Sequence, residues 1–150
     1  MRAPTLPPRV DAGPVQSRRA ARFGGNYMTV REAITQLQHV KPCQYDDATL
    51  TRWLSNLDGQ IHNDLLLTHE DTADAAFAPY DPEADMDAEL LAPDPYTDIY
   101  LKYLSAQVDF HNSEIPRYNN SVTMFLVAYA EFANWFNRTH MPLQKNYVRI

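Results

Sequence analysis

Apolar residues recur at three- and four-residue steps in four stretches of the chain, the spacing typical of amphipathic α-helices. The clearest stretch lies near the C-terminus, where steps of 4, 3, 4, 3 and 4 separate Tyr118, Val122, Phe125, Tyr129, Phe132 and Phe136. A helix from Arg117 to Asn137 would be about 31 Å long. We expect this helix to be the central strut of an all-α bundle.

A second apolar stripe follows Asp46 and Asp47, either of which can accept hydrogen bonds from the free amides of a first helical turn. Its apolar positions cover more than four turns and are Leu50, Trp53, Leu54, Leu57, Ile61 and Leu65. Gly59 interrupts this helix at a cost of about 1 kcal/mol relative to alanine. It indicates a kink or a close approach of another helix.

Two shorter helices complete the prediction. Thr29 is followed three residues later by Glu32, the pattern of a capping box, and the helix that they begin should end before Pro42. The other helix is expected to have Asp94 as its cap and Pro95 at its first position, where a missing amide costs nothing. The expected buried face of this helix consists of Ile99, Tyr103, Leu104 and Val108.

Residues 70–93 break the helical pattern and are predicted to form a long acidic loop. Its alternating acidic residues are Asp81, Glu83, Asp85, Asp87 and Glu89. A calcium-binding loop needs glycine at its sixth position and glutamate at its twelfth, and counting from Asp81 these are Met86 and Ala92. We therefore expect a solvated loop, tethered to the core by Leu90 and Leu91.

Composition and charge narrow the class of protein. The chain has 150 residues, 45% of them apolar, which is typical of one globular domain, and its single cysteine, Cys43, has no partner for a disulfide. No apolar run approaches the ~20 residues that cross a bilayer, so we expect no membrane segment. Residues 1–27 carry a net charge of +4, whereas residues 28–150 hold 8 basic and 18 acidic residues, a net charge of -10. This balance disfavours direct binding of DNA phosphates by the folded part.

The first 27 residues are rich in proline, arginine and glycine and show no helical or strand period, so we expect them to be disordered. One interpretation is an arm that binds nucleic acid, or a transit peptide. The other, which we favour, is that Met28 is the true start and that residues 1–27 are upstream sequence translated in error. The two glycines before Asn26 are what a purine-rich ribosome-binding site would encode.

No pattern typical of a catalytic or metal site stands out. His62 and His69 lie seven residues apart, but the further ligands of a zinc site are missing. The four glycines form no phosphate-binding loop, and Ser105 and Ser121 lie in no nucleophile motif. We predict no enzyme activity, no cofactor and no bound metal.

The chain ends with an extended tail, residues 143–150. Pro142 blocks continuation of the preceding helix because it lacks an amide and clashes with the previous turn. Several residues beyond it have a strand preference. We expect the tail to dock on another subunit through Leu143, Lys145, Tyr147, Val148, Arg149 and Ile150, with a frayed terminus as the alternative.

Three segments together resemble a known family: YDDATLTRWLSNLDGQI, LLAPDPYTDIYLKYLSAQVDFHN and RYNNSVTMFLVAYAEFANWFNRTHMP. They are similar to the neck adaptor, or head–tail connector, proteins encoded beside the portal and capsid genes of tailed bacteriophages. The resemblance covers residues 28–142 and includes no catalytic set. It rests on spaced residues, namely Trp53, Asp58, Gly59, Pro93, Pro95, Tyr96, Tyr118, Asn119, Asn137, Arg138 and Pro142.

The resemblance implies a helical connector domain over residues 28–142 that forms a ring beneath the portal, in the neck of the virion. Its partners would be the portal protein, a tail or stopper protein and further copies of itself, with DNA passing through the channel without specific binding. An acidic lumen would let DNA slide, and the acidic loop is a candidate lining, with a plain solvent-facing loop as the alternative. Two other functions stay open: another neck or tail-completion protein, and a small DNA-binding or packaging protein, which the acidic exposed faces disfavour.

Overall fold

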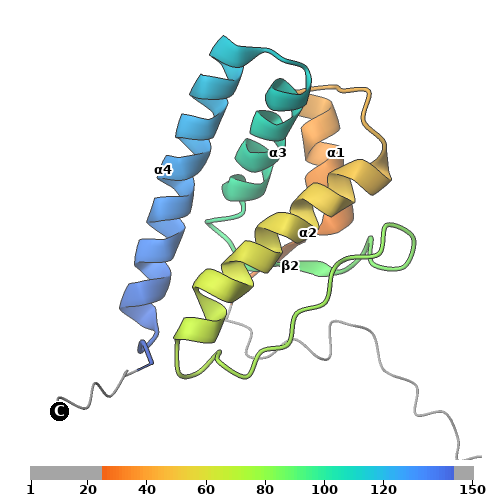
Figure 1. Ribbon diagram of the computed structural model, residues 1–150. Coiled ribbons are helices and arrows are strands. Elements are labelled where there is room, and N and C mark those ends of the chain that lie inside the picture. The colour runs from red at the N-terminus through yellow and green to blue at the C-terminus, as the bar shows by residue number, and fades with distance from the viewer. Residues whose placement is uncertain (1–24, 144–150) are drawn as a thin grey trace, which may run out of the picture.

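The computed structural model describes residues 25–143, which form a mainly helical fold with one small two-stranded sheet (Figure 1). In chain order the elements are β1 (Tyr27–Thr29), α1 (Val30–Val40), α2 (Asp47–Asp64), the 3₁₀ helix η2 (Leu66–Thr68), β2 (Glu89–Pro93), α3 (Asp98–His111) and α4 (Ile115–Thr139). The all-α class predicted from the sequence is confirmed as far as the fold is mainly helical. The predictions for residues 1–24 and 144–150 lie outside the described residues.

The first two helices begin where the sequence predicts. The Thr29 hydroxyl accepts a hydrogen bond from the Glu32 amide at 3.2 Å, and the Glu32 carboxylate accepts one from the Thr29 amide at 3.1 Å, so the capping box is confirmed. Asp46 caps α2 by accepting a hydrogen bond from the amide of Thr49 at 2.9 Å. Hydrogen bonding from Thr49 lowers the pKa of the Asp46 carboxyl.

The predicted start of the third helix is wrong. Asp94 is not its cap, because α3 begins four residues later, at Asp98. The amide of Asp94 donates to the carbonyl of Asn26 at 2.9 Å, and its carboxylate accepts from the Thr97 hydroxyl at 2.8 Å. Residues 94–97 form a turn, so Pro95 does not lie in the first turn of a helix. The Asp94–Pro95 peptide is cis. The chain therefore leaves β2 through this turn before α3 begins.

The sheet was not predicted. β1 and β2 pair antiparallel, with Tyr27 opposite Pro93 and Thr29 opposite Glu89, and the register is irregular between these two pairs. The strand pairing leads directly into α1, where the amide of Val30 donates to the carbonyl of Ala88 at 3.0 Å. β1 is three residues long, which is too short for the alternation of apolar and polar residues that marks a strand in a sequence.

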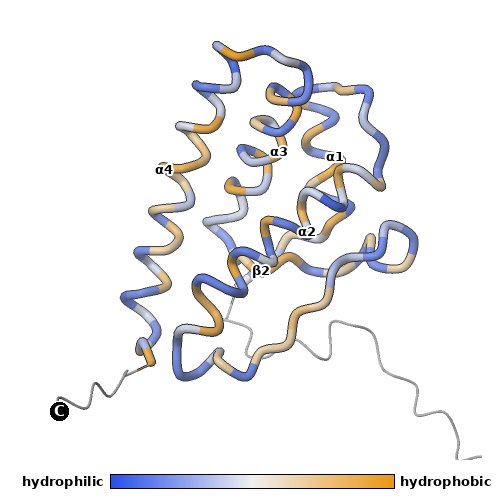
Figure 2. Tube along the Cα trace, in the orientation of Figure 1, coloured by the Kyte–Doolittle hydropathy of each residue, from blue (hydrophilic) through white to orange (hydrophobic). Residues whose placement is uncertain are grey.

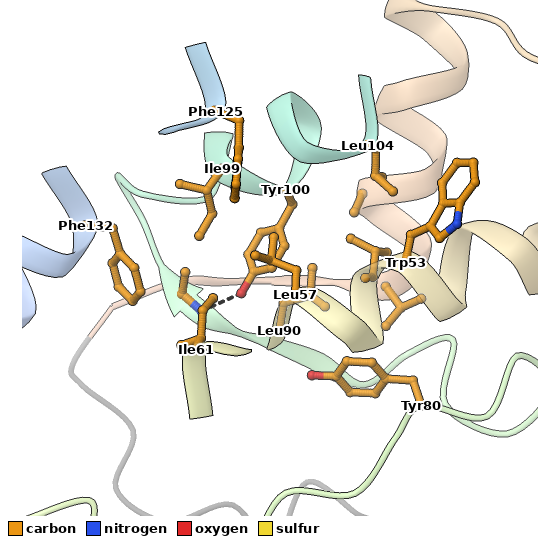
Figure 3. Packing of buried hydrophobic residues seen from close by; sticks show 14 of the residues in the cluster. Trp53, Leu57, Ile61, Tyr80, Leu90, Ile99, Tyr100, Leu104, Phe125 and Phe132 are labelled. Carbon is orange, nitrogen blue, oxygen red and sulfur yellow. Dashed lines mark hydrogen bonds between the residues drawn. The ribbon is translucent and has the colours of Figure 1, made fainter. Parts of the chain in front are cut away.

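The core gathers around α2 (Figure 3). Every apolar position of its predicted stripe is buried: Leu50, Trp53, Leu54, Leu57, Ile61 and Leu65. α1 and α3 both pack on α2, and Leu90 of β2 closes the core with 1% of its surface exposed. On α3 the fully buried aromatic residue is Tyr100, whereas the expected Tyr103 is half-buried.

α4 does not occupy the central position that its aromatic stripe predicted. It packs mainly on α3 and lies along one side of the molecule (Figure 1). Phe125, Phe132 and Phe136 are buried, while Tyr118, Val122 and Tyr129 are half-buried. The reason is that α4 contacts one neighbouring layer, so only one narrow face of the helix is covered. In the part of the chain that the structure describes, no helix is both long and apolar enough to span a membrane.

Candidate functional site

Three of the five predicted acidic residues, Asp81, Glu83 and Asp85, lie in a tight turn between α2 and β2. The Asp81 carboxylate accepts hydrogen bonds from the amides of Glu83 at 2.8 Å and Ala84 at 3.4 Å. The Asp85 carboxylate reaches back and accepts one from the Asp81 amide at 2.8 Å. Asp81 and Asp85 therefore hold the turn in shape, while Glu83 is exposed at its tip. Carboxylates that accept backbone amides in this way are common at turns.

The other two predicted acidic residues lie in different surroundings. Asp87 forms an exposed ion pair with Arg31 of α1, with 3.1 Å between Nε and Oδ1. Such an exposed pair contributes little to stability. Glu89 is part of β2 and half-buried, where it borders a cavity of about 650 Å³ together with Glu32, Asp94 and Asp98. The five acidic residues are thus close along the chain but do not form one flat surface.

The segment from Glu70 to Asp98 is the most acidic part of the molecule. It contains ten acidic residues and no lysine, arginine or histidine. Residues 25–143 as a whole contain 18 acidic and 6 basic residues, a net charge of -12. A surface with this balance repels a phosphate backbone over the Debye length, which is about 8 Å at physiological salt.

A buried carboxylate fixes this acidic segment to the helices. Asp58 of α2 is fully buried and accepts hydrogen bonds from the hydroxyls of Tyr80 at 2.5 Å and Tyr100 at 2.6 Å. It also accepts the amide of Leu91 at 3.1 Å. The Tyr100 hydroxyl in turn accepts from the amide of Ala92 in β2 at 2.7 Å, the dashed line in Figure 3. Asp58 therefore ties α2, α3, β2 and the segment before the turn together.

Asp58 also affects the pKa of Tyr100, one of its two tyrosine partners. Burial and the nearby charge of Asp58 raise the pKa of Tyr100 well above its usual range. Tyr100 therefore stays a hydrogen-bond donor at any physiological pH. The sequence contained a signal for this network, because Asp58 lies on the apolar face of α2, four residues after Leu54 and three before Ile61.

A second buried carboxylate, Asp109 of α3, joins three helices. Its partners are the Lys41 ammonium at the end of α1 and the Ser121 hydroxyl of α4, which donates at 2.5 Å. Burial alone would raise the pKa of Asp109, but hydrogen bonds from Lys41 and Ser121 together with the Lys41 charge lower it. Asp109 thus stays ionised and positions α4 against α3. This role of Ser121 was not predicted from the sequence.

The chain leaves α4 in an extended conformation at the predicted place. The Leu143 amide donates to the Thr68 carbonyl at 2.8 Å, and the Glu70 amide donates to the Met141 carbonyl at 2.9 Å. Pro142 lies opposite His69 in this short antiparallel bridge. Of the predicted docking residues, Leu143 is described and is 46% exposed; Lys145, Tyr147, Val148, Arg149 and Ile150 lie outside the described residues.

Aromatic stacking anchors the base of this extended segment. The His140 ring stacks on Phe136 with 4.0 Å between ring centroids, and the His69 ring meets Phe136 edge-on at 4.7 Å. His69 Nδ1 lies 2.6 Å from the Leu65 carbonyl oxygen, and its Nε2 lies 2.9 Å from Asn137 Oδ1. His69 therefore contacts the C-terminal end of α4 through its ring, and the exit direction of the chain is fixed by packing.

Between residues 25 and 143, no group of three or more histidine, cysteine, aspartate or glutamate side chains is placed to hold a metal ion. The main features of the described residues are an acidic segment from Glu70 to Asp98, two buried carboxylate networks and an extended C-terminal exit. Comparison with protein-family models, with curated proteins and with solved structures found no match to this chain.

Proposed function

We propose that the protein is a structural subunit of the head–tail connector of a tailed bacteriophage. In this role it forms a ring beneath the portal, joins the capsid to the tail and continues the DNA channel. Its work is assembly and not catalysis. The proposal includes a finer view of the fold, a bundle of about four helices with a long acidic loop between η2 and β2 and a docking tail over residues 143–150.

The observation that carries the proposal is the way the chain leaves the fold. Residues 141–143 are already extended and already paired with another backbone segment, Thr68–Glu70. A chain that leaves a domain in this conformation is suited to continue as an added strand on a partner, with backbone hydrogen bonds supplying affinity and alternate side chains supplying specificity. The partner that fits the resemblance is the portal protein.

The charge of the domain supports the same proposal. A channel protein must surround DNA without holding it, and a net charge of -12 over residues 25–143 gives no long-range attraction for phosphate. The turn at Asp81–Asp85 is a candidate lining of the channel. A DNA-binding or packaging protein would need arginine, lysine, asparagine or glutamine side chains at the base edges.

The proposal is tested by mixing the purified full-length protein with the portal protein of the same phage. We expect co-elution in size-exclusion chromatography and, in negative-stain images, extra ring-shaped density on one end of the portal. A protein with the same net charge but an unrelated fold is the control for non-specific association. Absence of co-elution together with unchanged portal images would contradict the proposed function.

A further inference from the structure

The chain leaves α4 along a segment whose backbone is paired but whose side chains are largely uncovered. Residues 141–143 pair with Thr68–Glu70 through the two backbone hydrogen bonds described above. Met141 is nevertheless 63% exposed and Leu143 46% exposed. Figure 2 shows this exit at the end of α4, beside the segment that follows α2. Because a short pair of strands is at best marginally stable in water, the exit depends on side chains next to it.

Two histidines flank the exit, one on each strand of the bridge. His69 lies opposite Pro142, and His140 lies two residues before it. Both are buried, with 3% and 8% of their surfaces exposed. Both rings contact the ring of Phe136, in the last turn of α4. The two strands of the bridge are therefore attached to one buried aromatic ring.

Hydrogen bonds hold the His69 ring from two sides. Its Nδ1 faces the Leu65 carbonyl oxygen at the end of α2, and its Nε2 faces Asn137 Oδ1 on α4, at 2.6 and 2.9 Å. Because the two ring nitrogens point in different directions, polar partners at both leave the ring one orientation. His69 thus fixes the first strand of the bridge relative to the last turn of α4.

Stacking holds the His140 ring. It lies nearly parallel to the Phe136 ring, with 8° between the ring planes and 4.0 Å between centroids. Its Nε2 lies 3.5 Å from Asp71 Oδ2, but the Asp71 side chain is 54% exposed, so this contact contributes little. His140 is also the residue at which the backbone changes from helical to extended. The direction of the exit is therefore set where the His140 ring is stacked.

We propose that His69 and His140 position the C-terminal arm for its partner and so set the affinity of docking without touching the partner. Together with Phe136 they form what we call the histidine clamp. Both histidines are buried, so an effect of their substitution on binding does not come from a lost direct contact. The inference rests on the proposed function, in which residues 143–150 are the docking arm, and adds the residues that hold the base of that arm.

The clamp acts on affinity through the order of the unbound chain. A backbone that is already ordered loses less conformational entropy when a partner binds to it. Without the clamp, only a fraction of the molecules would present the arm in the binding direction, and the apparent dissociation constant rises by the inverse of that fraction. A fraction of one tenth gives a tenfold weaker association.

Amide hydrogen exchange of the full-length protein, followed by NMR, tests the clamp itself. The Leu143 amide reports on the bridge, and the amide of the fully buried Leu54 reports on global unfolding. We expect His140→Ala to speed exchange at Leu143 at least tenfold and at Leu54 less than threefold. His140→Phe keeps a ring on Phe136 and should exchange like the wild type, as should His39→Ala, an exposed position on α1. Acceleration at Leu143 that is no larger than at Leu54 would overturn the proposal.

A surface substitution gives a second measurement that does not remove a buried ring. Asn137→Ala deletes the polar partner of His69 Nε2 while leaving both rings in place. We expect it to speed exchange of the Leu143 amide at least threefold. Asn134→Ala, at an exposed position on the same helix, is the matched control and should leave that exchange unchanged. Equal exchange in the two variants would show that His69 does not hold the exit.

Portal binding by the same full-length proteins tests the effect on docking. We expect His140→Ala to raise the dissociation constant for the portal at least tenfold, whereas His140→Phe and His39→Ala should leave it unchanged. If the wild type binds the portal and His140→Ala binds it equally well, this inference alone is wrong. A wild type that does not bind the portal would overturn the connector function and the role of the clamp in docking together.

Discussion

Two buried carboxylates, Asp58 and Asp109, connect segments that are far apart in the sequence. Asp58 receives hydrogen bonds from residues 22, 33 and 42 positions away, and Asp109 receives one from Lys41, 68 positions away. If the carboxylate is removed, the buried groups that donate to it are left without an acceptor. The loss of stability is then larger than the net contribution of the hydrogen bond itself. Single substitutions at these residues therefore test whether the arrangement is correct.

We expect Asp58→Asn to lower the free energy of unfolding by about 2–3 kcal/mol, because its amide group faces hydroxyl and amide donors. Asp64→Asn is the matched control on the same helix, where the side chain is exposed, and it should change stability by less than about 0.5 kcal/mol. Urea denaturation followed by circular dichroism measures both. Equal effects of the two substitutions would show that Asp58 is not buried in this network.

The lowered pKa of Asp109 gives a second prediction, for acid stability. A carboxyl whose pKa is lower in the folded state stabilises the fold above its unfolded pKa of about 3.9 and loses that contribution as the pH falls through the folded value. We expect Asp109→Asn to be less stable than the wild type by about 2 kcal/mol at neutral pH. The difference should persist to pH 5 and shrink below about pH 4. A difference that grows on acidification would contradict this assignment.

At the scale of whole elements, the starts of α1 and α2 and the buried face of α2 could be predicted from the sequence. The start of α3 and the way the elements pack on one another could not. The caps at Thr29 and Asp46 depend on side chains next to the helix, so local sequence was sufficient. The start of α3 was missed because Asp94 is held by Asn26, 68 residues earlier, which no local pattern reveals. The outer position of α4 was missed because periodicity shows which face is apolar, not how many neighbours cover it.

The interior of α2 gives a prediction at this scale. Gly59 lies in mid-helix, and a methyl group added there would lie 3.5 Å from Phe77 Cε1, an ordinary contact distance. We expect Gly59→Ala to stabilise the protein by about 0.5–1 kcal/mol through its higher helix propensity. Gln60→Ala, at the exposed neighbouring position, is the control. A loss of more than about 0.5 kcal/mol in Gly59→Ala would mean that another segment approaches α2 more closely than the structure shows.

For the whole molecule, the sequence predicted that the candidate site contains an acidic segment and an extended segment. It did not predict which residues these segments contact. The sequence indicated an acidic stretch from Asp81 to Glu89, but its division into a turn, an ion pair and a strand depends on tertiary pairing. The extended exit after α4 was predicted because Pro142 acts locally. Its pairing with Thr68–Glu70 was not, since those residues share no pattern with it.

The charge of the whole molecule predicts weak contact with DNA. We expect a chain that begins at Gly25 to show no binding to duplex DNA below about 100 µM at physiological salt. The full-length chain, measured in parallel by fluorescence anisotropy, reports any affinity that the five arginines of residues 1–24 add. A dissociation constant below about 1 µM for the shorter chain would favour a DNA-binding function.

The most direct test of the connector function is a chain that stops after Pro142. Among the described residues, the bond that it loses is the hydrogen bond from the Leu143 amide to the Thr68 carbonyl, worth about 1 kcal/mol, so we expect its circular dichroism and its cooperative unfolding to be retained. A full-length chain with residues 143–150 in reversed order is the control for tail length and charge. We expect both variants to fold and neither to co-elute with the portal protein; normal portal binding by the chain that stops after Pro142 would show that the tail is not the docking arm.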